Sequence, residues 1–225
     1  MPRRLALLLC PILNLAPAHA EGPNLATDGT DRLGAAAQLV LAQRVYQQAE
    51  ATGDPVLLLA AIRLARGVTT RPAPGWQRTG EVVDPPIPDP ESGPVNPGSE
   101  AALTVLEGLA SDDPDLQDLA YDLGALEPQA RNPVAMVARG GVAADSQDHW
   151  RMPLSGAVAA EIALIGDTGG LLGLTVTDDT GTVICTHPPS LDPALCRFTP
   201  ARNGFFTVEV TNAGPEGNSY QLVGN

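Results

Sequence analysis

Apolar and polar residues alternate with a period of two through much of the last third of the chain. The clearest runs are 157–165, 172–176 and 205–211. Such alternation is typical of strands that bury one face against a core. Turn-forming residues separate the runs, as in Asp-Asp-Thr-Gly at 178–181. Residues 131–225 are therefore predicted to form an antiparallel β-sandwich or jelly roll, with 134–139 as its first strand.

The chain ahead of this region follows a helical period instead. Apolar residues from Leu33 to Val45 recur at steps of three and four, which predicts a helix that Thr30 or Asp31 caps. Asp-Pro at 54–55, Asp-Pro at 113–114 and Ser99 mark further helix starts, because these side chains accept hydrogen bonds from free N–H groups. We therefore expect a small bundle of about four helices over residues 31–130, and an α+β chain of two domains.

A shared pattern relates two of these helices. Asp-Pro-x-Leu-x-x-x-Ala-x-x-Leu occurs at 54–64 and again at 113–123. One interpretation is a duplicated helical hairpin, somewhat like tetratricopeptide-type pairs. The other is that Asp-Pro begins both helices for capping reasons alone.

A proline-rich segment at 71–97 interrupts the helical region. Eight of its 27 residues are proline, which removes backbone donors and favours extended conformations. The segment is predicted to be a loop that Trp76 pins, either as a connector lying over the helices or as a docking peptide for a partner's groove.

Residues 1–20 have the features of a secretory signal peptide. Two arginines precede a short apolar core, and Ala-His-Ala at 18–20 fits the small-x-small cleavage rule. The apolar run is shorter than the roughly 20 residues that a bilayer requires. We therefore expect a mature chain that is periplasmic or secreted and does not span a membrane, with 21–30 as a flexible lead-in.

Removal of the leader leaves two cysteines, Cys185 and Cys196, in an oxidising compartment. A structural disulfide is the favoured interpretation, and a redox pair or a metal site is the alternative. The spacing is not Cys-x-x-Cys, and His187 alone adds too few ligands for zinc.

The net charge narrows the choice of partner. It is −13 for the whole chain, and it becomes −15 once residues 1–20 are removed with their two arginines; lysine is absent. Nucleic acid and anionic lipid surfaces are therefore improbable partners, because like charges repel.

The residues of the last third also suggest a family. The relevant segments are Asp148-His149-Trp150, Gly156, Gly166-Asp167, 174–185, 203–212 and 218–222. Together they resemble the bacterial pre-peptidase C-terminal domain, a small β-sandwich commonly appended to secreted enzymes. The family's Asp-x-Asp-Leu strand start, linked to calcium in some members, reads Gly-Gly-Leu-Leu-Gly-Leu at 169–174. The resemblance implies a domain that assists a neighbouring activity rather than performing one.

Few residues suggest chemistry directly. The sequence contains no nucleophile elbow, no His-Glu-x-x-His and no phosphate-binding glycine loop. Asp167, Asp178 and Asp179 are the best candidate ligands for calcium, the one cofactor considered, although they do not form a twelve-residue calcium loop.

The function that these observations favour is a non-catalytic binding or accessory role, in contact with an envelope or secreted protein or with a saccharide or peptide. Trp76, Trp150 and Tyr220 are candidate contact residues, with core burial as the alternative for the last two. A carboxylate-dependent hydrolase at the domain junction and a structural envelope component are the competing hypotheses.

Overall fold

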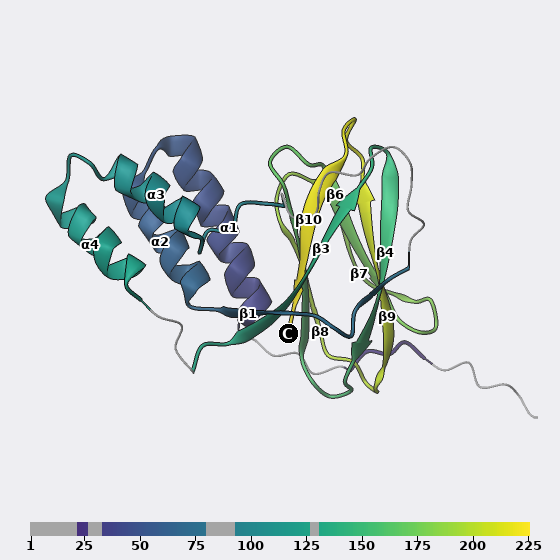
Figure 1. The fold of residues 1–225 in the computed structure, drawn as a ribbon. Coiled ribbons are helices and arrows are strands. Elements are labelled where there is room, and N and C mark those ends of the chain that lie inside the picture. The colour runs from purple at the N-terminus through teal and green to yellow at the C-terminus, as the bar shows by residue number, and fades with distance from the viewer. Residues whose placement is uncertain (1–21, 27–32, 80–92, 127–130) are drawn as a thin grey trace, which may run out of the picture.

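A computed structural model describes residues 22–26, 33–79, 93–126 and 131–225 (Figure 1). Helices lie at one end of the molecule and a β-sandwich at the other, so the predicted α+β class is confirmed. The predicted signal peptide falls outside the described residues. In the described part of the chain, no helix is both long enough and apolar enough to cross a membrane.

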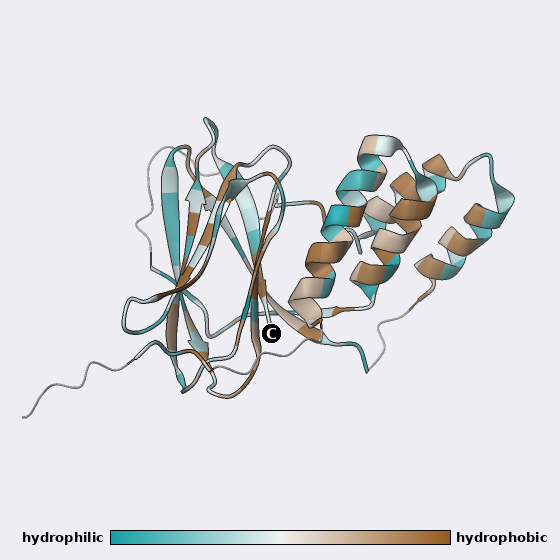
Figure 2. Cartoon of the chain, turned by 180° about the vertical axis from the view of Figure 1, so that it is seen from behind, coloured by the Kyte–Doolittle hydropathy of each residue, from teal (hydrophilic) through white to brown (hydrophobic). Residues whose placement is uncertain are grey.

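The helical part consists of two helical hairpins. Its helices are α1 (Ala35–Thr52), α2 (Pro55–Arg66), α3 (Glu100–Leu109) and α4 (Pro114–Gly124). The predicted caps Asp54, Ser99 and Asp113 each accept a backbone N–H of the first turn. In Figure 2 the helices carry hydrophobic stretches between hydrophilic ones, as amphipathic helices do. Leu58, Ile62, Leu103 and Leu106 are among the residues of their shared core.

The sandwich consists of two five-stranded sheets. Sheet A has the order β1 (Thr69–Pro72), β3 (Val134–Val142), β10 (Asn218–Gly224), β5 (Ala160–Gly166) and β8 (Ala194–Phe198). Sheet B has the order β2 (Gln77–Arg78), β4 (Ser146–Leu154), β9 (Gly204–Asn212), β6 (Leu172–Thr177) and β7 (Val183–Ser190). Apolar side chains from both inner faces form the largest core, as the period-two pattern predicts.

Sheet A is packed on both faces, although α1 covers only part of the outer one. The inner face packs against sheet B, and the outer face packs against α1, the helix nearest the sandwich in Figure 1. Ala36 and Val40 of α1 meet Ala163 and Val223 of the sheet there. The chain therefore has a third core, between bundle and sandwich, which holds the two parts together.

Two sequence predictions about the chain before residue 131 are wrong. The proline-rich segment is not a loop at its start, because β1 pairs in parallel with β3 and β2 pairs with β4. The cap of α1 is neither Thr30 nor Asp31: Gly34 is the N-cap residue, and it has no side chain with which to cap the helix. Glu161 of β5 provides the carboxylate instead, accepting from Gly34 and Ala37.

The predicted flexible lead-in also has a fixed point. Asn24 is fully buried, and its backbone N–H donates to Asp178 Oδ2 at 2.7 Å. Its side-chain oxygen accepts from the backbone N–H of Arg202 at 2.8 Å. The chain ahead of α1 is thus anchored to the end of the sandwich.

Candidate functional site

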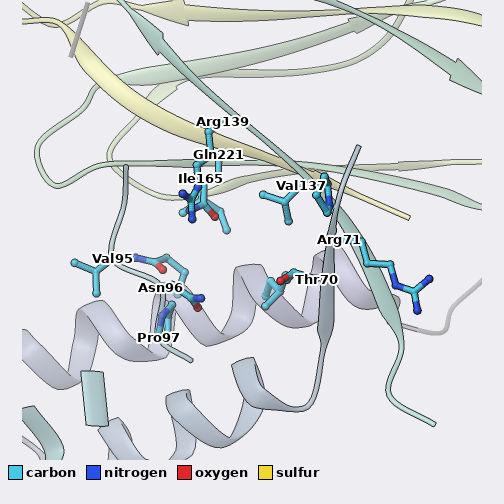
Figure 3. Close-up of a pocket in the computed structure, with 12 residues that line it drawn as sticks. Thr70, Arg71, Val95, Asn96, Pro97, Val137, Arg139, Ile165 and Gln221 are labelled. Carbon is cyan, nitrogen blue, oxygen red and sulfur yellow. The ribbon is translucent and has the colours of Figure 1, made fainter. Parts of the chain in front are cut away.

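A groove lies where the helical bundle meets sheet A. Its larger part is a cavity of about 500 Å³ (Figure 3). The sides come from α1, from the outer face of sheet A, from strand β1 and from residues 95–97, which precede α3. The residues around it are Leu39, Gln43, Thr70, Arg71, Pro72, Val95, Asn96, Pro97, Val137, Arg139, Ile165 and Gln221.

A smaller cavity of about 250 Å³ adjoins the first and shares Gln43 and Val95 with it. Its lining includes three carboxylates, Glu50, Asp167 and Asp192. We call the two cavities together the junction groove. One end of the junction groove therefore holds arginine side chains and the other end holds acids.

Strand register brings the central residues of the groove together. Gln221 is paired with Arg139 on one side and with Ile165 on the other. Paired residues of adjacent strands point to the same face of a sheet, so these three side chains form a row on the outer face. Figure 3 shows them projecting from the sheet toward Asn96, while Arg71 projects away from the others.

Gln43 is the most unusual residue of the groove. Only 5% of its surface is exposed, and it lines both cavities. Within the described part of the chain, its side-chain amide makes no hydrogen bond. Among the described residues no fully buried side-chain nitrogen or oxygen lacks a partner, so the Gln43 amide faces the space of the cavities, where water can pair with it. An amide held in this state at the wall of a cavity is suited to pairing with a ligand.

Tyr46 lies beside the acidic end of the groove. Burial raises the pKa of its phenol to about 12, and the hydrogen bond and charge of Glu50 act in the same direction. Tyr46 therefore stays a neutral hydroxyl at ordinary pH. Tyr46 does not supply a general acid or base that titrates near neutral pH.

The three aromatic residues that the sequence suggested as contacts lie in the sandwich core. Trp76, Trp150 and Tyr220 are 9%, 7% and 0% exposed. Core burial, rather than contact with a partner, is what the structure shows for these rings. Trp76 does pin its segment, because it packs against the backbone of Gly224 in β10.

The two rings on β4 and β10 belong to a buried polar network. Trp150 Nε1 donates to the Tyr220 hydroxyl at 2.7 Å, and that hydroxyl donates to Asp148. Arg78 of β2 forms an ion pair with Asp148 at 2.8 Å and donates to the carbonyl of Gly141 at 2.6 Å. Every member is partnered, so the network is structural: it joins β2 to both sheets.

The candidate calcium ligands do not converge. Asp167 follows β5, whereas Asp178 and Asp179 follow β6 at the end away from Gly166. A six-residue strand is about 20 Å long, which is far beyond the reach of one ion. Asp178 accepts from Asn24, Thr180 and Thr182, and Asp179 pairs with Arg202. One three-carboxylate calcium site is therefore incompatible with this geometry.

The disulfide prediction is confirmed. Cys185 of β7 and Cys196 of β8 are bonded, with 5.9 Å between their Cα atoms. Together with His187 they are the one group of three potential metal ligands found in the described residues. The disulfide occupies both sulfurs, and His187 Nε2 lies 2.9 Å from the carbonyl oxygen of Leu195. This group therefore holds the edges of the two sheets together.

Sequence reasoning missed the groove residues Gln43, Arg139 and Gln221. Each comes from a different element, and none lies in a motif. One signal was present: 134–139 was predicted as a strand, and its alternation places Arg139 on the face opposite Met136 and Ala138. The sequence gives no sign that a helix covers part of that face.

Comparison with known proteins bears on the sandwich alone. No family model matches the chain, and no curated protein matches it. The pre-peptidase C-terminal domain of a collagenase from Bacillus anthracis is similar to it in structure. That match has 15% identity and a TM-score of 0.34, and it covers 39% of this chain and 87% of that one. The sandwich is a structural match to the pre-peptidase C-terminal domain, as the strand pattern predicted.

Other solved structures are similar over the same share of the chain. A periplasmic inhibitor of g-type lysozyme from Aeromonas hydrophila is 9% identical, with a TM-score of 0.30, covering 40% of this chain and 84% of that one. A chitosan-binding module from a Paenibacillus chitosanase/glucanase is 16% identical, with a TM-score of 0.25, covering 44% and 80%. Similarities this low describe the sandwich fold and carry no argument about activity.

Proposed function

We propose that this chain is an exported binding protein without catalytic machinery, and that the junction groove is its binding site. The single observation that carries the proposal is Gln43. Its buried amide has no partner within the described residues, and it borders both cavities of the groove. A ligand that supplies a donor or acceptor there exchanges the amide's contact with water for a hydrogen bond in a partly enclosed site.

The chemistry of the groove supports binding rather than turnover. The residues of the larger cavity include two arginines and three amides, but no carboxylate, histidine or cysteine. Hydrolysis by paired carboxylates requires two acids facing one another across the scissile bond. In the smaller cavity Asp167 accepts from Thr168 and Ser219, and Glu50 is hydrogen-bonded to Tyr46, which holds these carboxylates in place and leaves them further acceptor sites for a cation.

Side-chain amide signals offer a direct test. The mature protein, residues 21–225, is labelled with ¹⁵N and screened by NMR against pooled short peptides and pooled oligosaccharides. We expect the largest changes at the side-chain amides of Gln43 and Gln221. Replacing Arg63, an exposed arginine of α2 outside the groove, with Gln should leave the response unchanged.

Changes that cluster on the outer face of sheet B, with none at Gln43, would contradict the groove as the binding site. Turnover of a glycoside or ester panel by the same sample would contradict the non-catalytic role. The predicted export has its own readout: the protein recovered outside the cytoplasm should begin near Glu21, as measured by intact mass.

A structural envelope role is favoured by one further observation. The hairpin of α3 and α4 exposes apolar side chains, with Leu119 51% and Tyr121 77% exposed. Residues 100–126 contain seven acids and no basic residue. At low salt these negative charges repel a second copy of the same surface and oppose association through its apolar side chains. Sedimentation of the mature protein at increasing salt tests the role, because self-assembly should appear only when those charges are screened.

A further inference from the structure

We propose that the ligand of the junction groove is an extended peptide segment that carries a carboxylate at one end and a cationic group at the other. This inference rests on the function proposed above. It follows from the order of charged, amide and aliphatic side chains along the groove. The proposed function names the binding site, and this inference adds the chemical class of the ligand.

The carboxylate belongs at the Arg139 end. Arg139 is an exposed residue of β3 beside the amide of Gln221, with which it is paired in register. A guanidinium binds a carboxylate through two parallel N–H donors, and a neighbouring amide adds a third. The carboxylate is that of a chain terminus or of an acidic side chain, because both offer the same two acceptor oxygens.

The cationic group belongs at the other end, in the smaller cavity. Glu50, Asp167 and Asp192 line it, and no basic residue does. Arg44 lies beside Asp192 in the next hollow along the surface. We therefore assign the ligand's cation to Glu50 and Asp167. A neutral or purely acidic saccharide supplies no cation for this end, only hydroxyl donors.

The middle of the groove suits a polypeptide main chain. Gln43 and Asn96 each offer a donor and an acceptor, as a peptide group does; Gln43 lines both cavities, and Asn96 lines the larger one next to the shared residue Val95. Leu39, Val137 and Ile165 supply aliphatic surface for side chains. The described lining of the larger cavity contains no aromatic ring on which a sugar would stack.

Strand β1 adds a main-chain contact. It is an edge strand of sheet A, and the N–H groups of Thr69 and Ala73 donate to Pro133, just ahead of β3, and to Val137 of β3. Backbone groups alternate in direction along a strand, so those of Thr70 and Pro72 point to the open edge. Pro72 has no N–H, which leaves Thr70 as the residue that offers both groups to an added strand.

The experiment uses a synthetic library of random hexapeptides with free termini, selected on the mature protein. The enriched peptides are then remade with an amidated C-terminus and with an acetylated N-terminus. We expect enrichment of peptides that combine an acid and a base. Loss of affinity on amidation identifies the terminal carboxylate as the group bound, whereas unchanged affinity identifies an acidic side chain.

Two variants connect the affinity to the proposed contacts. Arg139→Gln should weaken binding about tenfold or more, since a charge-assisted hydrogen bond is lost. Gln43→Leu should weaken it by about three- to tenfold while leaving the melting temperature unchanged or raised, because the amide pairs with nothing in the described protein. Arg63→Gln is the matched control for the loss of one exposed arginine.

The outcomes separate the ligand class from the binding site. Binding of an oligosaccharide, sensitive to Arg139→Gln and Gln43→Leu, would overturn the peptide inference and leave the groove as the site. Peptide binding that neither variant alters would overturn both. A Gln43→Leu variant of lowered stability would show that the amide has an internal role, which also contradicts the inference.

Discussion

Glu161 Oε1 accepts the backbone N–H of Gly34 at 2.9 Å, across 127 residues of sequence. The other carboxylate oxygen accepts from Ala37 at 3.0 Å, so one buried side chain of β5 caps the first turn of α1. Arg197 of β8 lies 3.2 Å from Oε1 and balances the charge. The sandwich thus positions the helix that forms one wall of the groove, because α1 has no capping side chain of its own.

Replacing Glu161 with Ala is expected to lower the free energy of unfolding by about 2–3 kcal/mol. The change removes a helix cap and leaves N–H groups of the first turn unpaired in a buried place. Urea unfolding followed by far-UV circular dichroism measures it. Glu209→Ala, on the outer face of sheet B beside His149, is the control and should cost less than about 1 kcal/mol.

The same residue shows where sequence reasoning stopped. The alternation in 157–165 correctly predicted a strand from Ala160 onward, with Ala160, Ile162 and Leu164 in the core, whereas Val158 lies ahead of the strand and is exposed. It also suggested that the face with Glu161 and Ala163 is open, yet both are buried. Helix α1 covers that face. A period-two pattern reports only which residues share a face of the strand, so it cannot predict that a helix more than 100 residues earlier in the chain packs there. The function of Glu161 was hidden for that reason.

Strands β1 and β2 were missed for a different reason. They have four and two residues, and prolines surround them. Pro72 is tolerated because its missing N–H faces the open edge of sheet A. The junction groove was beyond prediction altogether, since its walls come from α1, β1, β3, β5 and β10, which only the tertiary fold brings together.

Tyr220→Phe is expected to cost about 1–3 kcal/mol of stability. The hydroxyl links Trp150 Nε1 to Asp148, and its removal leaves the indole N–H unpaired in the core. Burial, and then the charge of Asp148, raise the pKa of this phenol above its ordinary range, so the group is a neutral donor throughout the accessible pH range. Guanidinium unfolding monitored by tryptophan emission is the measurement. Tyr121→Phe, at a site 77% exposed, should be near neutral.

Loss of the Cys185–Cys196 disulfide is expected to cost about 2–3 kcal/mol, because it closes a short loop in the unfolded chain. The bond joins β7 of sheet B to β8 of sheet A, so its loss frees two edges of the sandwich. A Cys185→Ala/Cys196→Ala variant should melt below the wild type. A reductant should lower the wild-type melting temperature and leave that of the variant where it is. An equal response of both proteins would contradict this assignment.

Asp178 should make the protein acid-sensitive within a defined window. Burial acts to raise the pKa of its carboxyl, but hydrogen bonds from Asn24, Thr180 and Thr182 outweigh that effect and lower the pKa from 3.8 to about 2. The folded pKa lies below the unfolded one, so the stabilisation is nearly complete above about pH 4.5 and is lost as the pH falls toward 2. It amounts to at most about 2 kcal/mol.

The difference in unfolding free energy between wild type and Asp178→Asn measures this contribution. It should be constant from pH 7 to about 4.5 and shrink toward pH 2, whereas Asp122→Asn, at an exposed site on α4, should show no such trend. A carboxyl titration of Asp178 by NMR gives an independent value. A midpoint near 3.8 would mean that the bond from Asn24 does not hold the chain ahead of α1 to the sandwich in solution.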